Sequence, residues 1–201
     1  EKQISPRTKG IVIINPNNPT GYLYSQKELE DLANIIKKYN LYLYSDEVYR
    51  RYCYDDLKHY SVMNLAGIEQ NTILFDSMSK RYSECGIRIG AIITRNKAVL
   101  EAALKFGMAR LCPPALGQIA AEASLDTSEE YFTSVYQEYI QRRNYMVETL
   151  NEMPGVVCPM PKGAFYSIVR LPVDDAEKFS RWLLEEFSYE GETVMLAPAS
   201  G

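Results

Sequence analysis

The chain has 201 residues, of which 46% are hydrophobic and 24% are charged, and its formal net charge is −4. This balance is typical of a globular protein, and the mild negative charge favours neither a nucleic-acid partner nor a membrane partner. No stretch approaches the roughly 18 consecutive apolar residues that a membrane-spanning helix needs.

The cysteine and histidine content narrows the chemistry further. Cys53, Cys85, Cys112 and Cys158 are far apart and form no Cys-x-x-Cys pair, and His59 is the single histidine. These residues predict no metal site, zinc included, and they disfavour a nucleophile that is activated by histidine. Scattered thiols are typical of a reducing compartment, so we expect a cytoplasmic protein.

The first half of the chain alternates strands of buried type with helices. Continuous apolar runs predict strands at 11–14, 41–45, 72–76 and 89–94. Ser25 and Glu28 form a capping-box pattern at the start of one helix, and a second helix is expected over 97–106. The alternation predicts an α/β fold whose mostly parallel, doubly wound sheet is covered by helices on both faces.

The second half of the chain follows a different pattern. After two prolines, a long helix is expected from about 116 to 150, with an interruption near Asp126. Short apolar runs at 155–157, 164–169 and 194–196 predict strands, and a helix is expected over 174–187. This order is typical of a smaller α+β domain.

The two patterns divide the chain into three parts. We expect part of a large domain at 1–115, a connecting long helix at 116–150 and part of a small domain at 151–201. The chain starts at Glu1 within a polar run and stops at Gly201 just after an apolar segment. We therefore expect a fragment of a longer protein.

Polar clusters follow three of the predicted strands. They occupy residues 15–21, 46–49 and 77–80. In a parallel sheet the carboxyl ends of neighbouring strands lie at one edge, and ligands bind there. The sequence therefore predicts that the three clusters meet in one crevice.

These clusters carry a family resemblance. The run Ser77-Met78-Ser79-Lys80, with Gly86-Ile87-Arg88-Ile89-Gly90 after it, resembles the lysine signature of the class I and II aminotransferases, which are pyridoxal-phosphate enzymes of fold type I. Residues 15–21 resemble the family's Asn-Pro-x-Asn-Pro-Thr-Gly turn, residues 45–49 its Asp-Glu-x-Tyr segment, and residues 161–166 a stretch of its small domain. The resemblance extends from about Lys9 to the end of the chain.

The resemblance implies pyridoxal 5'-phosphate as the cofactor and gives roles to the residues around its ring. Lys80 matches the lysine that binds the cofactor covalently and later moves a proton. Asp46 matches the carboxylate that keeps the pyridine nitrogen protonated, so that the ring accepts electrons. Asn18 and Tyr49 match the residues that hydrogen-bond the ring oxygen.

The resemblance also implies a phosphate site. Arg88 matches the phosphate-binding arginine, whose planar guanidinium suits a bidentate contact, and Ser77 matches a phosphate-binding hydroxyl, with Ser79 as an addition. The family's phosphate-cupping loop and ring-stacking aromatic residue have no counterpart in this sequence. The family's substrate-carboxylate arginine is expected beyond Gly201, so Arg170 is not given that role.

The implied reaction is transfer of an amino group from an amino acid, with aspartate as the family default, to a 2-keto acid. Lyases and decarboxylases on the same fold use the same groups, and some transcription regulators carry an aminotransferase-like effector domain, so these alternatives stay open. A plain doubly wound nucleotide-binding domain is disfavoured, because neither Gly-x-Gly-x-x-Gly nor a P-loop occurs in the sequence.

The family resemblance also implies a homodimer with active sites near the subunit boundary. The segment 106–114 corresponds to a region near that boundary, and Arg110 is a cation within this otherwise apolar stretch. Two interpretations of Arg110 stay open. It is a solvated or ion-paired charge at a helix end, or it reaches the neighbouring site and binds the side-chain carboxylate of a dicarboxylic substrate.

Overall fold

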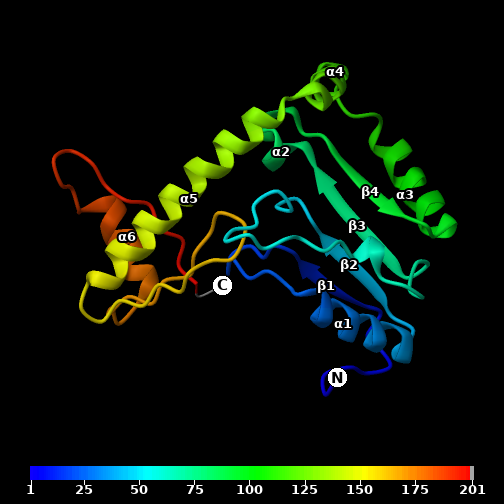
Figure 1. Cartoon of the computed structure of the whole chain (residues 1–201), viewed down its shortest axis with the longest axis horizontal. Coiled ribbons are helices and arrows are strands. Elements are labelled where there is room, and N and C mark those ends of the chain that lie inside the picture. The colour runs from blue at the N-terminus through cyan, green and yellow to red at the C-terminus, as the bar shows by residue number, and fades with distance from the viewer. Residues whose placement is uncertain (200–201) are drawn as a thin grey trace.

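A four-stranded sheet forms the centre of the first half of the chain in the computed structural model, which describes residues 1–199 (Figure 1). Strands β1 (Gly10–Ile14), β2 (Tyr42–Asp46) and β3 (Thr72–Ser77) are parallel, and β4 (Gly90–Thr94) is antiparallel to β3. The order in the sheet is β1-β2-β3-β4. The expected mostly parallel α/β fold is therefore confirmed.

Helix α1 (Gln26–Tyr39) covers one face of this sheet (Figure 1). Its capping box is present, because Glu28 N donates to Ser25 Oγ at 3.3 Å and Ser25 N donates to Glu28 Oε2 at 2.8 Å. The helix buries Leu29, Ala33 and Ile36. These side chains share a core with residues of β1, β2 and β3, namely Ile13, Leu43 and Leu74.

The opposite face of the sheet is less covered than we expected. Tyr44 and Phe75 stack on that face with ring centroids 6.4 Å apart. Val12 and Ile92, which the strand register places on the same face, are 72% and 46% exposed. Within residues 1–199, therefore, the expected helical cover on both faces is incomplete.

The chain turns sharply between β3 and β4 and then continues as helices. A single helical turn, α2 (Met78–Arg81), follows β3, and helix α3 (Lys97–Arg110) follows β4. Helix α4 (Ala115–Ala123) and a 3₁₀ turn at Ser124–Asp126 precede the long helix α5 (Glu129–Glu152). The expected interruption near Asp126 is thus confirmed.

The strands expected in the last third of the chain are absent from its described part. Helix α6 (Ala176–Glu185) forms within the expected helical range. Residues 155–157 contribute one isolated bridge, from Val157 to Arg170, and residues 164–169 contribute none, although the preceding Gly163 bridges to Cys53. Val194 and Met195 are 55% and 79% exposed and pair with no strand. A strand needs a continuous hydrogen-bonding neighbour, and among the described residues these runs have at most one isolated bridge.

Two further features bear on function. Among the described residues, no helix is long and apolar enough to cross a membrane. The same residues hold no group of three or more His, Cys, Asp or Glu side chains that could bind a metal ion. The division of the chain at residues 115 and 150 stays a prediction.

Candidate active site

The polar clusters that follow β1, β2 and β3 lie side by side at one edge of the sheet. The register pairs Ile14 with Asp46, and Asp46 with Phe75. Beyond these pairs, Asn15 N donates to Asp46 O at 2.9 Å, and Glu47 N donates to Phe75 O at 3.1 Å. The parallel strands therefore bring together the three segments that the sequence singled out.

The turn after β1 is fixed by its own side chains and by a distant segment. Asn17 Oδ1 accepts hydrogen bonds from Thr20 N and Thr20 Oγ1 at 3.1 and 2.7 Å. Gly21 has φ +68°, and a Cβ there would clash with Pro161 Cβ. The Gly21 carbonyl accepts from Lys162 N and Gly163 N, both at 2.9 Å. Two segments that resemble family motifs, 140 residues apart by their numbering, are thus in direct contact.

Lys80 lies in α2, directly beyond β3. Ser77 caps this turn, because Ser79 N donates to Ser77 Oγ at 3.1 Å. Tyr52 OH donates to the Lys80 carbonyl at 2.7 Å and so holds the backbone of the turn. The half-buried Lys80 amine lies 5.8 Å from the centre of the Phe165 ring and forms no ion pair within residues 1–199. Its amine is therefore available for chemistry.

Asp46 and Tyr49 lie at the end of β2. Asp46 Oδ1 accepts a hydrogen bond from Val48 N at 3.1 Å. Tyr49 is 4% exposed, and its hydroxyl lies 2.7 Å from Tyr166 OH and also interacts with Asn18. Burial, and then the contact with Tyr166, raise the pKa of Tyr49 well above its ordinary value. Tyr49 is therefore held as a protonated hydrogen-bond donor.

Arg88 lies beside the two serines of the Lys80 turn. The adjacent Ile89 carbonyl is 3.1 Å from Ser77 Oγ and accepts from Met78 N at 3.2 Å. Arg88 has φ +58°, a left-handed conformation that residues other than glycine rarely adopt, and its guanidinium donates to Cys85 O at 2.7 Å. Such backbone conformations cluster at functional sites. The exposed guanidinium and the hydroxyls of Ser77 and Ser79 together could bind an anion.

The structure also shows charged residues near the site that the sequence analysis missed. Asp76 accepts from Arg50 Nη2 at 2.7 Å and from Arg81 Nη2 at 2.9 Å. This cluster connects the turn after β2 to the residue that follows Lys80. Ion pairs between remote residues leave no periodic or motif signal in a sequence, which explains the omission.

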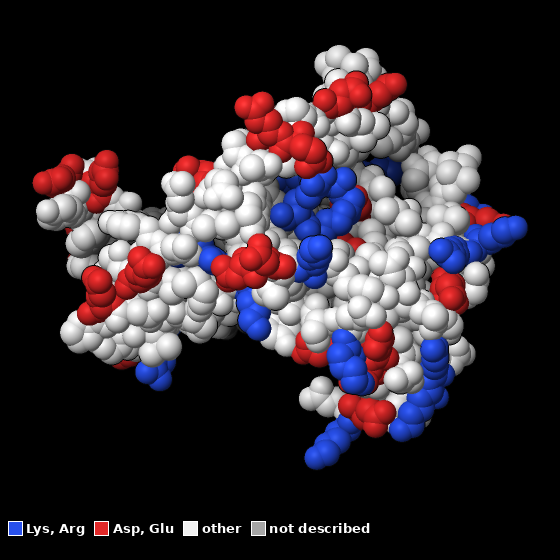
Figure 2. Space-filling view, in the orientation of Figure 1, with Lys and Arg blue, Asp and Glu red and all other residues white. Residues whose placement is uncertain are grey.

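Basic side chains gather near the centre of one face of the molecule, bordered by acidic ones (Figure 2). A surface hollow close to the Lys80 turn is lined by Arg51, Arg81 and Glu129, among others. Arg51 binds Glu129 with Nη2 to Oε1 at 3.0 Å. The charge around the turn is therefore largely paired, in contrast to the free amine of Lys80.

Arg110 is not brought to this site within the chain. It is the last residue of α3, it is exposed, and it forms no ion pair with another described residue. The structure therefore leaves both interpretations of Arg110 open, and a role in the neighbouring site stays a prediction.

Comparison with known proteins gives the family. The family model "Aminotransferase class I and II" matches residues 1–190. The chain is 36% identical to the glutamate-pyruvate aminotransferase AlaA of Escherichia coli, over 89% of this chain and 45% of that protein. It is 35% identical to an aspartate aminotransferase of Pyrococcus horikoshii, over 92% of this chain and 48% of that protein. The chain thus spans about half the length of the curated relatives it matches.

Solved structures agree with the sequence comparison. An aromatic aminotransferase from Pyrococcus horikoshii superimposes with a TM-score of 0.85 at 34% identity, covering 92% of this chain and 50% of that chain. An alanine aminotransferase from Pyrococcus furiosus gives 0.82 at 35% identity, covering 91% and 48%. From the family match and the shared fold, this chain belongs to the class I and II aminotransferase family.

Proposed function

We propose that this chain carries the cofactor-binding part of a pyridoxal 5'-phosphate-dependent aminotransferase. The reaction is transfer of an amino group from an amino acid, with aspartate as the expected donor, to a 2-keto acid. The observation that carries the proposal is the unpaired amine of Lys80 at the sheet edge where Asp46 and Tyr49 also lie. The names of the relatives given above refer to glutamate and pyruvate, aspartate, aromatic amino acids and alanine, and they support an amino-acid substrate.

The chemical groups at this edge fit pyridoxal 5'-phosphate. Its pyridine nitrogen needs a carboxylate, which Asp46 supplies, and its ring oxygen needs donors, which Asn18 and Tyr49 supply. Its aldehyde needs an amine that is not engaged in an ion pair, and Lys80 has one. Its phosphate needs hydroxyl donors, which the neighbouring Ser77 and Ser79 offer, and a guanidinium donor, which the exposed Arg88 offers from the residue next to Ile89, whose carbonyl Ser77 contacts.

The proposed mechanism assigns work to the chain's own residues. When bound, the cofactor supplies an electron sink for the charge that develops on the substrate. Asp46 holds the proton at the pyridine nitrogen, and Tyr49, kept protonated by its raised pKa, donates to the ring oxygen. The Lys80 amine takes a proton from the substrate α-carbon as a general base. It then returns the proton to the C4′ carbon of the cofactor as a general acid.

Reductive labelling tests this proposal. The protein is incubated with pyridoxal 5'-phosphate, reduced with borohydride and mapped by peptide mass spectrometry. We expect the pyridoxyl group on Lys80, no label in Lys80→Ala, and normal labelling of Lys80 in Lys27→Ala, which removes an exposed lysine on α1. A label placed mainly on another lysine would contradict the assignment.

We further propose a homodimer that forms through α3, α4 and their connection. Large apolar side chains are 64–82% exposed over this stretch: Leu104, Phe106, Met108, Leu111, Leu116 and Ile119. Monomers rarely expose contiguous apolar surface of this kind, whereas protein interfaces bury it.

Arg110 lies within this apolar stretch, and we propose that it serves the partner's site by binding the side-chain carboxylate of an acidic substrate. In the catalytically active dimer, Arg110→Ala should raise KM for acidic donors about tenfold or more and leave small neutral donors unchanged. Sedimentation velocity checks that the variant remains dimeric. A uniform change in KM across all donors, or no change, would show that Arg110 is an ordinary charge at a helix end.

The cysteines support the cytoplasm as the proposed compartment. Cys53 and Cys158 are buried, Cys85 and Cys112 are exposed, and all four are free thiols. Exposed free thiols persist in reducing surroundings.

A further inference from the structure

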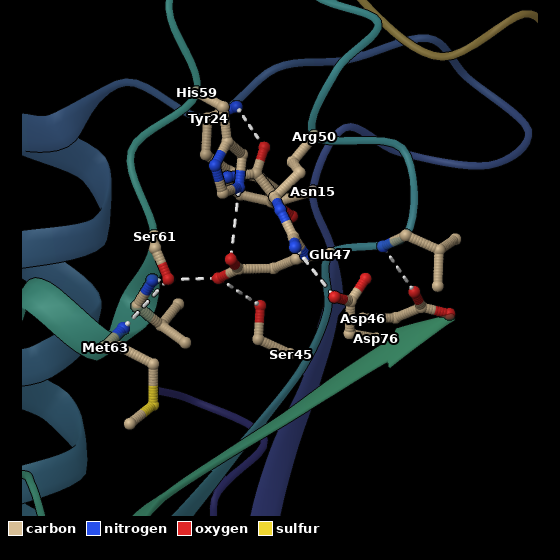
Figure 3. A network of polar contacts seen from close by, with 12 residues as sticks. Asn15, Tyr24, Ser45, Asp46, Glu47, Arg50, His59, Ser61, Met63 and Asp76 are labelled. Atoms are coloured by element: carbon tan, nitrogen blue, oxygen red, sulfur yellow. Dashed lines mark hydrogen bonds and ion pairs between the residues drawn. The ribbon is translucent and has the colours of Figure 1, made fainter. Parts of the chain in front are cut away.

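A buried polar network lies directly behind Asp46 (Figure 3). Alternation along β2 places Asp46 on the open face of the sheet, together with Tyr44, and Ser45 on the face covered by α1. Glu47 hydrogen-bonds Ser45 and is only 1% exposed. Two neighbouring carboxyl groups therefore have different surroundings: Asp46 is partly exposed to solvent, and Glu47 is buried.

The two oxygens of the Glu47 carboxyl have different partners. Oε1 accepts a hydrogen bond from Val62 N at 2.9 Å and lies 3.3 Å from Ser45 Oγ, and Ser61 adds a further contact. Oε2 faces His59 Nε2 at 3.5 Å. Figure 3 shows the imidazole directly above the carboxyl group. Glu47 thus attaches the end of β2 to the loop that carries His59 and Val62.

His59 extends the network to the turn after β1. Its side chain is 9% exposed, and the imidazole also hydrogen-bonds the backbone of Asn15. Asn15 is fully buried, its Oδ1 accepts from Tyr24 N at 3.1 Å, and its N donates to Asp46 O at 2.9 Å. The network therefore connects the end of β2 both to the turn after β1 and to the loop that carries His59 and Val62.

The geometry leaves one proton to be shared between Glu47 and His59. Arg50, whose charge acts on both groups, forms its ion pair with Asp76 at 2.7 Å rather than with Glu47. One ring nitrogen of His59 donates to the Asn15 backbone, so in an uncharged imidazole the other must accept, and Glu47 must then be the donor. Burial raises the pKa of Glu47, while burial and the charge of Arg50 lower that of His59 to about 4. Both effects favour the uncharged pair over an ion pair.

We propose that Glu47 and His59 are positioning residues for Asp46: they form an uncharged carboxyl–imidazole pair that fixes the end of β2 from the face opposite the Asp46 carboxylate. The catalytic role of Asp46 rests on the proposed function, whereas the existence of the Glu47–His59 pair does not. It can therefore be tested without the cofactor.

The single histidine of the chain gives a direct test of the pair. In protein labelled with ¹⁵N-histidine, we expect one set of imidazole signals with one protonated nitrogen from about pH 5.5 to 8, where a free histidine titrates. Glu47→Gln should preserve this pattern, since an amide can donate to the same ring nitrogen. An imidazole with both nitrogens protonated at neutral pH would overturn the uncharged pair.

Hydrogen exchange tests the positioning role. The Val48 amide donates to Asp46 Oδ1 and reports whether that carboxylate is held, while the Ile36 amide in α1 reports global stability. Glu47→Ala should speed exchange at Val48 about tenfold more than at Ile36, the extra local loss expected for one buried hydrogen bond on top of any loss of global stability. Glu47→Gln, and Glu148→Ala on the exposed side of α5, should change neither amide by more than about twofold.

The outcomes separate the possible failures. Equal acceleration at Val48 and Ile36 would show a merely structural role for Glu47, and an effect of Glu47→Gln as large as that of Glu47→Ala would show that the carboxylate charge matters; either result overturns the proposal. If Glu47→Ala does not fold, His59→Gln removes the pair while keeping the Val62 contact, and the same excess acceleration at Val48 over Ile36 is required. Absence of label on wild-type Lys80 would defeat the proposed function, not this inference.

Discussion

The Asp46 carboxylate ends β2 with one oxygen on Val48 N at 3.1 Å and with no ion pair to any described residue. In the proposed reaction it keeps the pyridine nitrogen protonated, whereas an amide cannot. Asp46→Asn should therefore lower kcat by on the order of 100-fold or more, the usual loss when one preorganised electrostatic contact is removed. Cofactor affinity should fall far less, because the lysine and phosphate contacts remain.

Titration of pyridoxal 5'-phosphate against the variant separates the two quantities, with kcat measured at saturating cofactor. Val48 makes its hydrogen bond through the backbone, and an asparagine oxygen can accept it, so the local fold is retained. Near-normal turnover of Asp46→Asn at saturating cofactor would show that this carboxylate does not face the pyridine nitrogen.

Sequence patterns identified the residues that belong to local motifs but not the residues that hold them. Lys80, Asp46 and Arg88 could be proposed because each lies in a run that resembles a family motif in order and spacing, and their roles stay predictions. The contacts from Tyr52 to the Lys80 carbonyl and from His59 to Glu47 join residues 28 and 12 positions apart. Such contacts depend on how the segments pack, and no periodicity encodes them.

One buried arginine is prominent among the contacts between helix α5 and the first half of the chain. Arg143, with a side chain 7% exposed, donates to Asp55 at 2.8 and 2.9 Å and to Pro161 O at 3.1 Å. The same guanidinium lowers the pKa of Asp55 through a direct hydrogen bond. The helix is thereby held beside both the loop after β2 and the segment that contacts Gly21.

Asp55→Asn should lower the free energy of unfolding by about 1–3 kcal/mol, because it removes the carboxylate charge that faces a buried guanidinium. The figure lies below that for a fully buried pair, since Asp55 is 54% exposed and partly screened by water. Asp31→Asn, which breaks the exposed pair with Lys27, is the matched control and should have no measurable effect. Urea titrations of both variants give the comparison, and equal losses would contradict a structural role for the buried arginine.

At the level of whole elements, the sequence pattern correctly predicted the helices and strands that are determined by local interactions. The four strands and the α1 capping box were recoverable because a buried strand must be apolar and a helix start must satisfy its free N–H groups. The strands expected at 155–157, 164–169 and 194–196 failed because apolar runs do not specify a partner. Residues 164–166 instead pack their aromatic and small side chains against Tyr49 and Tyr52 from the first half of the chain.

The stability of the whole molecule should depend on pH through its one histidine. Burial and the charge of Arg50 lower the pKa of His59 in the folded state to about 4, against an ordinary value of 6.5. As pH falls below about 6.5, the unfolded chain binds this proton before the folded chain does. The stabilisation is therefore fully present above about pH 6.5 and is lost as pH falls toward 4, by at most about 1.4 kcal/mol per pH unit.

Glu47 has the opposite sign, because burial raises its pKa in the folded state: its contribution is present at low pH and is lost as pH rises through the raised value. The carboxyl groups of Asp55 and Asp175, whose pKa values are lowered by hydrogen bonds, act in the same direction as His59 but below their ordinary value of 3.8. The contribution of His59 to the free energy of unfolding between pH 6.5 and 4 can therefore be isolated only by comparing the wild type with a variant that lacks His59.

His59→Gln provides that difference, since the chain has no other histidine. The variant should be less stable than the wild type at pH 7.5 by about 1–3 kcal/mol, because it removes the buried imidazole that faces Glu47 and hydrogen-bonds the Asn15 backbone. On going from pH 6.5 to 4.5, however, its free energy of unfolding should fall by less than that of the wild type, and the gap between the two proteins should narrow. Urea unfolding at several pH values in one buffer series measures the gap. If it stays constant or widens as the solution is acidified, His59 is not held uncharged in the folded state.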